Sequence, residues 1–288
     1  DTIEANPDFV APDYRRNEVL GFLKNEKLED LCISRPKERL EWGIPLPFDP
    51  DYVTYVWFDA LTNYLSSPRS RGEEAALWPA DIHVIGKDIL KFHAVYWPIM
   101  LKAAGLELPK QVLVHGWWQK DNQKMSKSTG NVVEPVTVID DWGLDAFRYY
   151  VVRELAIGPD GNWTDEGFAS RYGAELANGL GNLMNRSLSM LNRYRDGVVP
   201  EPSEELSAEA IATRDKLVKE LKSSDLQGGL RTIWAYIARV NQYVDQTAPF
   251  KMAKDPDQAE RLGGVLYNLV EICRLLAVWL QPYLPDTS

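Results

Sequence analysis

The sequence contains few cysteines and few histidines. Two cysteines, Cys32 and Cys273, and three histidines occur among 288 residues. Two cysteines cannot build a disulfide framework or a four-cysteine zinc site, and three scattered histidines suggest no other metal centre. We therefore expect no metal site in this segment. So little cysteine suits a reducing compartment and predicts a cytoplasmic protein, or one from an organelle with similar redox conditions.

Long apolar runs and an excess of positive charge are also missing. No uninterrupted apolar run reaches the ~20 residues that a helix needs to cross a bilayer, so we expect no membrane partner. The formal net charge is −10, whereas proteins that bind nucleic acid usually carry a basic surface. This argues against a nucleic-acid partner for the chain as a whole, although it leaves room for a local basic surface.

The first half of the chain reads as alternating strands and helices. The composition is that of a globular protein, long enough for about two domains. Three segments share the apolar, β-branched and aromatic composition of buried strands: 52–61, 83–85 and 110–118. The first runs into a helix, and a second helix is expected from Gly86 to about Gly105. Such alternation predicts a parallel sheet.

Ligands in parallel sheets bind at the carboxyl ends of the strands. Three groups of side chains are expected at those ends: Phe58–Asp59, Gly86–Asp88 and His115–Trp118.

The second half reads as helical. Strand signals stop after about residue 140, and residues 164–283 are almost all helix, with breaks at 197–205 and 223–229. Apolar side chains in 230–244 and 262–280 recur at i, i+3, i+4 and i+7, the period of a helix with one buried face. These patterns predict a helical bundle, and an α/β half followed by an all-α half. Residues 1–40 have a modest helical pattern, and three prolines exclude a helix over 41–51.

One loop between the halves carries charged and hydroxyl side chains. Residues 123–135 read QKMSKSTGNVVEP. Its lysines, hydroxyls and backbone N–H groups suit a polyphosphate, and Gly130 lets the loop change shape. Such a loop can close on a charged transition state. The alternative is a solvated surface loop.

The string KMSKS at 124–128 resembles the second signature of class I aminoacyl-tRNA synthetases. Further strings resemble the methionyl-tRNA synthetases of that class: DLCISR (30–35), WGIPLP (42–47), YVWFDALTNY (55–64), HVIGKDILKFHAVYWP (83–98), VLVHGWW (112–118), LGNLMNRS (180–187) and DQTAPFKMAK (245–254). The resemblance covers essentially the whole chain. It implies the second half of a Rossmann-like parallel-sheet catalytic domain, a linker domain with the KMSKS loop, and an α-helical bundle.

The resemblance also divides the chain into four parts. These are the end of a connective insertion with a re-entry segment (1–40), the second half of the catalytic domain (41–120), the KMSKS loop with a stem-contact linker (121–163), and a helical anticodon-binding domain (164–288).

The implied reaction joins methionine to tRNA(Met) through methionyl-adenylate. ATP enters with Mg²⁺ as its counterion. Lys127 is expected to be the principal phosphate contact, with Lys124 and Arg35 as further catalytic residues. The residues implied in ATP binding are Gly86, Asp88, His115, Trp118, Ser126, Lys127 and Ser128. Gly86 and Asp88 would hold the ribose, Trp118 would place its backbone near adenine, and His115 would be a hydrogen-bonded structural histidine.

A methionine pocket must recognise a thioether, which offers almost no hydrogen bond. Apolar and sulfur–aromatic contacts, each worth ~0.3–1.5 kcal/mol, have to supply the recognition. The resemblance implies a pocket of Trp57, Ala60, Leu61, Tyr64, Phe92 and His93, with Tyr64 and His93 as polar tips near the sulfur. Leu61 stands where related enzymes often have proline and is expected to add bulk at the rim. Alternatively, Trp57 and Phe92 are ordinary core aromatics.

Three residues are implied in anticodon binding: Asn182, Arg186 and Phe250. The first two are four apart and share one helix face. Phe250 replaces the usual tryptophan and keeps a stacking face, so we expect weaker anticodon reading; stacking is worth ~1–3 kcal/mol per base. A local basic surface would come from Arg193, Arg195, Lys251 and Lys254. The alternative is a solvated helix face with Arg186 in a salt bridge.

The first class I signature, H-x-G-H, does not occur in the sequence. We therefore expect the C-terminal part of a longer enzyme, with the missing N-terminal half as a partner and little activity for this chain alone. Two other interpretations stay open. One is a tRNA anticodon-binding module without chemistry, and the other is a synthetase for leucine, isoleucine or valine.

Overall fold

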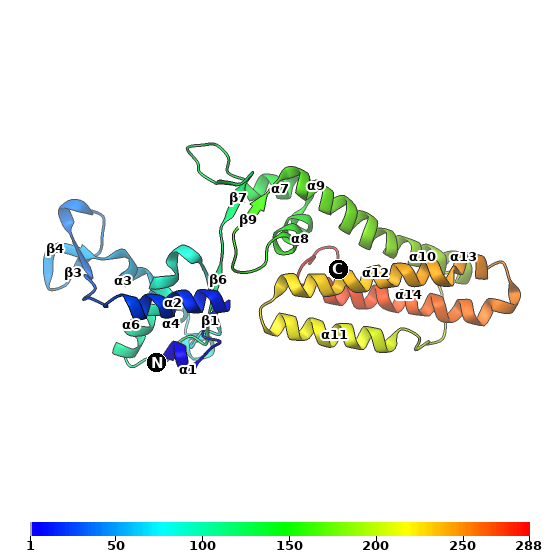
Figure 1. The fold of residues 1–288 in the computed structure, drawn as a ribbon, viewed down its shortest axis with the longest axis horizontal. Coiled ribbons are helices and arrows are strands. Elements are labelled where there is room, and N and C mark those ends of the chain that lie inside the picture. Colours follow the sequence, from blue (N-terminus) through cyan, green and yellow to red (C-terminus); the bar gives the residue numbers. More distant parts are fainter. Residues whose placement is uncertain (1) are drawn as a thin grey trace. The chain divides into compact units, whose positions relative to one another are not determined.

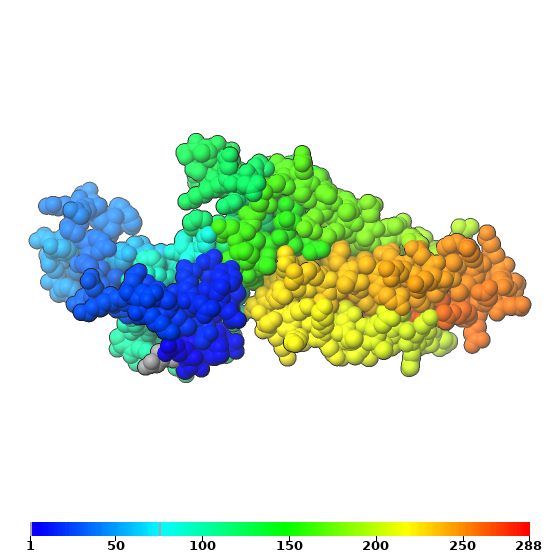
Figure 2. Space-filling model, in the orientation of Figure 1, coloured from blue at the N-terminus to red at the C-terminus, as the bar shows by residue number. Residues whose placement is uncertain are grey.

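The computed structural model describes residues 2–288. The chain forms two compact units, one ending at Trp117 and the other beginning at Trp118. Each unit is described by itself (Figures 1 and 2).

The first unit contains a three-stranded parallel sheet. Its strand order is β1 (Val10–Ala11), β6 (Gln111–His115) and β5 (Ile82–Gly86). The central strand is the most buried, with Val112 and Val114 fully enclosed. Helix α2 (Asp13–Asn25) and residues of the 90–95 segment pack against the sheet. The expected strands at 83–85 and 110–118 are therefore confirmed, although β6 ends at His115.

The helix expected between Gly86 and Gly105 is interrupted. It consists of a 3₁₀ turn (Lys87–Ile89), a π-helical segment (Phe92–Tyr96) and α6 (Trp97–Ala103). A π-helical turn shifts the register of side chains by one residue relative to an α-helix, and such turns often occur at functional sites.

The segment 52–61 was wrongly predicted to be a strand of the parallel sheet. Its strand, β4 (Asp49–Thr54), pairs antiparallel with β2 (Ser34–Pro36) and β3 (Pro45–Leu46) in a separate sheet. Only Val53 of β4 is buried. Phe58 and Asp59 consequently lie in the short helix α3 (Val56–Ala60) and do not end a parallel strand. Composition alone could not reveal this, because aromatic and β-branched residues suit either kind of sheet.

Short helices complete the first unit: α1 (Thr2–Ala5), the 3₁₀ turn Lys37–Arg39, α4 (Asn63–Ser70) and α5 (Glu74–Leu77).

The second unit begins with a small sheet. Strand β7 (Trp118–Lys120) pairs antiparallel with β8 (Gln123–Lys124) and parallel with β9 (Gly161–Trp163). The two-residue turn between β7 and β8 has positive φ at Asp121 (51°) and Asn122 (62°), as a type I′ hairpin requires. The expectation that strands end near residue 140 was wrong for β9, since three residues are too few to show a period.

Three helices cover this sheet: α7 (Pro135–Trp142), α8 (Leu144–Glu154) and α9 (Asp165–Arg171). A π-helical segment (Tyr172–Gly181) then leads into long helices: α10 (Asn182–Arg195), α11 (Ser207–Lys222), α12 (Leu226–Thr247) and α14 (Ala259–Leu280). Two short turns, α13 (Pro249–Met252) and a 3₁₀ turn (Pro256–Gln258), join the last two.

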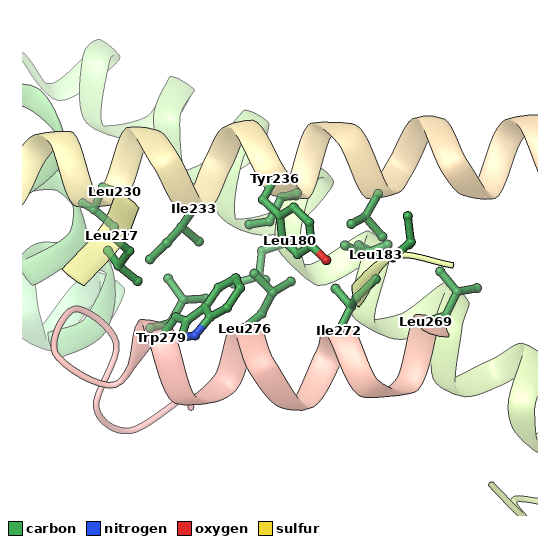
Figure 3. Packing of buried hydrophobic residues seen from close by; sticks show 14 of the residues in the cluster. Leu180, Leu183, Leu217, Leu230, Ile233, Tyr236, Leu269, Ile272, Leu276 and Trp279 are labelled. Atoms are coloured by element: carbon green, nitrogen blue, oxygen red, sulfur yellow. The ribbon is translucent and has the colours of Figure 1, made fainter. Parts of the chain in front are cut away.

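The predicted apolar stripes meet in the core of the second unit. Figure 3 shows Ile233 and Tyr236 of α12 facing Ile272 and Leu276 of α14. The predicted break at 223–229 is shorter than expected, because α12 already begins at Leu226. The carboxylate of Asp225 caps it by accepting the Gly228 N–H at 2.8 Å.

The segment Pro256–Leu280 is long and apolar enough to cross a membrane by length and composition alone. Within the fold, 56% of its apolar window is buried. Its apolar character is therefore accounted for by packing against α10 and α12.

Candidate functional site

Four of the residues expected in the methionine pocket lie together in the first unit. The Trp57 ring of α3 stacks on Phe92, with centroids 4.3 Å apart and planes 13° from parallel. The His93 ring meets Trp57 edge-on at 6.0 Å. The Tyr64 hydroxyl lies 2.9 Å from His93 Nε2. The group is therefore an aromatic cluster with a single polar pair at its centre.

The protonation state of this polar pair follows from its hydrogen bonds. His93 Nδ1 lies 3.0 Å from the Ile89 carbonyl oxygen, which can only accept, so Nδ1 carries the hydrogen. In the neutral ring Nε2 then accepts from the Tyr64 O–H. Burial lowers the pKa of His93, and it raises the pKa of Tyr64. Both groups stay neutral near pH 7.

Two residues without an assigned role stand behind this pair. The Trp97 indole N–H donates to Nε2 of His83 at 3.3 Å, and the Tyr64 ring lies 4.2 Å from the His83 ring. Both His83 and Trp97 are buried. A histidine on the inward face of an otherwise apolar strand, between Ile82 and Val84, was the signal that could have revealed this contact.

The two other expected pocket residues, Ala60 and Leu61, differ in their exposure to solvent. Ala60 is exposed, at the end of α3. Leu61 is only 1% exposed and packs in a cluster with Leu65, Trp97 and Leu101. Leu61 is thus a core residue of this region and does not form an exposed rim, so its bulk is accommodated by packing.

The two buried histidines predict a loss of stability in mild acid. Burial, reinforced by the nearby His93, lowers the pKa of His83 from 6.5 to about 4. Below pH 6.5 the unfolded chain therefore binds protons that the folded chain does not, and stability falls as pH decreases toward 4. We expect the urea midpoint, followed by tryptophan fluorescence, to fall between pH 7 and pH 5. H83Q, which keeps an acceptor for Trp97, should flatten this dependence, and a dependence in H83Q equal to that of the unmodified protein would contradict the prediction.

Residues expected to hold ATP ribose lie at the carboxyl end of the parallel sheet. The β5–β6 register places Gly86 opposite His115. A Cβ at Gly86 would lie 2.7 Å from Asp88 Oδ1, so a larger residue here would require the Asp88 carboxylate to move. The Trp117 indole N–H donates to Asp88 Oδ1 at 3.2 Å, and the Lys87 ammonium lies 4.5 Å from the Trp117 ring centroid.

His115 makes the local hydrogen bond that we expected of a structural histidine. Its Nδ1 lies 2.8 Å from the Gly116 carbonyl oxygen. The structure thus brings Gly86, Asp88 and His115 to one edge, and adds Trp117 as a partner that the sequence did not single out.

Arg35 belongs to the antiparallel sheet. Its guanidinium lies 4.0 Å from the Tyr55 ring centroid and donates to the carbonyl oxygen of Ser34 at 2.7 Å. Its contacts are therefore with residues in or next to that sheet, and its catalytic role stays a prediction.

The remaining ATP candidates lie in the second unit. Lys124 ends β8, and Lys127 is exposed in the loop that follows. The hydroxyls of Ser126 and Ser128 lie 2.8 Å apart. Met125 packs against a buried cluster that includes Tyr150, so one apolar side chain anchors the loop.

Trp118 is partly buried against the same cluster, with its ring 6.3 Å from that of Tyr150. Its side chain therefore packs in the core of this unit, and the ATP role of its backbone stays a prediction.

The three anticodon candidates lie in the helical part of the second unit. Asn182 is exposed at the start of α10. Arg186 donates to Asp245 Oδ1 of α12 at 3.2 Å, so the salt bridge weighed as an alternative is present. Phe250 is 44% exposed. It lies two residues after Ala248, which caps the end of α12 in the left-handed conformation (φ 47°). The hydrogen-bond partner of Arg186, Asp245, thus lies five residues before Phe250 in the sequence.

Within residues 2–288, no three side chains of the metal-binding types His, Cys, Asp and Glu gather closely enough to hold an ion. The absence of a metal site stays a prediction.

Comparison with known proteins gives consistent matches. A family profile described as "tRNA synthetases class I (M)" matches residues 3–188. The methionine–tRNA ligase of Clostridium perfringens is 46% identical over an alignment of 296 positions, which covers 99% of this chain and 46% of that protein. The Bacillus subtilis enzyme is 45% identical over an alignment of 295 positions, which covers 99% of this chain and 44% of that protein. The chain spans about half the length of the curated relatives it matches.

Solved structures give the same result. Mycobacterium tuberculosis methionyl-tRNA synthetase in complex with methionyl-adenylate has a TM-score of 0.91 and 41% identity, covering 99% of this chain and 58% of that one. Its apo form has a TM-score of 0.87 and 39% identity, with the same coverage.

Proposed function

Because this chain belongs to the methionyl group of class I tRNA synthetases, we propose that it takes part in the ATP-dependent joining of methionine to tRNA(Met). In the first step a methionine carboxylate oxygen attacks the α-phosphorus of ATP, the bond to the bridging oxygen breaks, and pyrophosphate leaves. In the second, a terminal ribose hydroxyl of tRNA attacks the adenylate carbonyl carbon, and AMP leaves with the bonding electrons.

The observation that carries the proposal is the neutral Tyr64–His93 pair within the stacked aromatic cluster. The methionine side chain would lie against Trp57 and Phe92, where its sulfur makes aromatic contacts. A charged group there would favour polar competitors, whereas an uncharged pair favours a thioether. A tRNA-binding module without chemistry has no need for such a pocket. Discrimination against leucine, isoleucine or valine would rest on the shape of the same pocket.

Each unit carries candidate residues for ATP binding. Gly86 allows close backbone approach, and Asp88 can accept hydrogen bonds from the ribose hydroxyls. Lys127, supported by Lys124, Ser126 and Ser128, would stabilise the charge on the phosphates as pyrophosphate leaves. Mg²⁺ would enter as the counterion of ATP, since such ions are often held mainly by substrate phosphates and water.

The finer division of the chain belongs to this proposal. The sheet β7–β8–β9 with α7 to α9 would be the KMSKS linker region. Helices α10 to α14 would form the anticodon-binding bundle.

Strand β5 supports a further part of the proposal. It is an edge strand of the parallel sheet, and its outward side chains Ile82 and Val84 are 43% and 65% exposed. Parallel sheets are usually covered on both faces. We propose that the region of the longer relatives that this chain does not match adds strands beside β5, covers the face that bears Ile82 and Val84, and completes the ATP and methionine sites.

Methionine-dependent exchange of pyrophosphate into ATP tests the proposal. We would measure it with this chain alone and after addition of the unmatched region of the B. subtilis relative. Exchange in the mixture, and little with either part alone, is the expected result. No exchange in either case, together with binding of tRNA(Met), would leave only the anticodon-binding module.

The tRNA contacts give a separate prediction. We expect F250A to weaken binding of tRNA(Met) by about 10- to 100-fold, because it removes a stacking face worth ~1–3 kcal/mol. R186A should weaken binding through loss of a hydrogen-bonding cation. Filter binding at one fixed salt concentration measures both. V278A, an exposed apolar truncation in the same unit, is the control, and equal affinities for F250A and V278A would contradict the assignment.

A further inference from the structure

The loop that carries Lys127 is held together by one side chain to which we had assigned no role. Asn131 Oδ1 accepts the backbone N–H of Ser126 at 2.9 Å. Its Nδ2 donates to the backbone carbonyl oxygen of Lys124 at 3.2 Å. One carboxamide therefore bridges the end of β8 and the middle of the loop.

These partners determine the orientation of the carboxamide. The Ser126 N–H can only donate, and the Lys124 carbonyl can only accept. If the amide were flipped, both contacts would be lost. The Thr129 hydroxyl adds a third contact, since it lies 2.7 Å from Asn131 Oδ1 and 3.0 Å from the Ser126 carbonyl oxygen. Its single hydrogen can serve one of these acceptors at a time.

The other hydrogen bonds of the loop are local. Residues 125–134 lie outside any helix or strand, the Thr129 and Gly130 N–H groups donate to the Ser126 and Lys127 carbonyl oxygens at 3.3 Å each, and the Ser126 and Ser128 hydroxyls bond to each other. Gly130, with φ +68° and open space at its Cβ position, permits a change of conformation. In the sequence, Lys127 lies between Lys124 and Asn131, the two residues that the Nδ2 hydrogen bond joins.

We propose that Asn131 is a positioning residue for adenylate formation, which preorganises the loop so that the Lys127 ammonium is presented to the phosphates. This inference rests on the proposed function. It assigns Asn131 no contact with a substrate; its effect passes through the backbone of residues 124–126. The step in which Lys127 acts should therefore depend on Asn131, and the transfer of methionine from adenylate to tRNA should not.

The geometric part can be tested on this chain without activity. Trypsin cleaves after Lys124 and Lys127 only when the loop opens locally. We expect N131A to raise the cleavage rate at these two sites about tenfold, the effect of losing one or two net hydrogen bonds. Q123A, an exposed amide truncation in the same hairpin, is the matched control. Equal cleavage rates for N131A and Q123A would overturn the proposal.

The effect of Asn131 on activity is tested with the chain reconstituted with the unmatched region of a relative. We expect N131A to slow single-turnover adenylate formation at saturating ATP by about 10- to 100-fold, with unchanged transfer from isolated methionyl-adenylate to tRNA. N131D, which keeps the acceptor but not the donor, should fall between N131A and the unmodified protein. If the unmodified protein forms no adenylate, the proposed function fails. If it is active and N131A matches it, or if N131A slows both steps equally, the positioning role fails.

Discussion

Replacing Lys127 with alanine is expected to lower the rate of adenylate formation by about 100- to 1000-fold, the usual effect of losing one donor to a developing charge. Negative charge grows on the leaving pyrophosphate as the bond to the α-phosphorus breaks. An ammonium that the loop presents to the leaving group can meet that charge mainly in the transition state, where stabilisation raises the rate. Because Lys127 is exposed, its removal should leave the fold intact.

The measurement is single-turnover consumption of ATP by the reconstituted enzyme. K216A removes an exposed lysine from α11, far along the chain from the loop, and controls for the change in net charge. K127R should recover part of the rate, since it keeps the charge but changes its geometry. A rate for K127A that equals that of K216A would refute the assignment of Lys127.

The second large effect concerns stability. L276A should lower the free energy of opening of the second unit by ~2–5 kcal/mol, the usual effect of a buried leucine-to-alanine change. Leu276 is fully buried and lies between α14 and α12, beside Tyr236 (Figure 3). Its side chain is enclosed by two long helices, so the cavity cannot close without moving both.

Hydrogen exchange of the α12 amides measures this effect, and it needs no assumption that two units unfold in one step. V278A, two residues away on the same helix and 53% exposed, should change exchange by less than ~0.5 kcal/mol. Exchange of α12 in L276A that matches V278A would show that this core does not hold the two helices together.

The helical core could be predicted from the sequence because its pattern is long. Helices α12 and α14 have 22 residues each, so the 3.6-residue period repeats about six times. The short strands β1 and β9 have two and three residues. No period can be seen in so few residues, and their pairing depends on partners far along the chain.

The candidate site could be predicted in part. Sequence strings shared with a known family identified Trp57, Tyr64 and His93 as candidates. The structure then places these three residues together. The contacts that hold such residues in place were missed, because they join side chains that are distant in sequence. Trp117 and Asp88, for example, are 29 residues apart. Asn131 lay inside the quoted loop, but only the geometry shows that both ends of its amide are used.

The pairing of α12 with α14 has a consequence for synthesis of the protein on the ribosome. The apolar stripe of α12 is complete once residue 247 has been made, but its covering helix ends only at Leu280. At ~5–20 residues per second, the part of the stripe that faces α14 stays uncovered for roughly 2–7 s. During that interval it offers a binding site to chaperones and a surface for aggregation. Slow codons within 248–280 would lengthen this exposure, so their placement should influence the yield of folded protein.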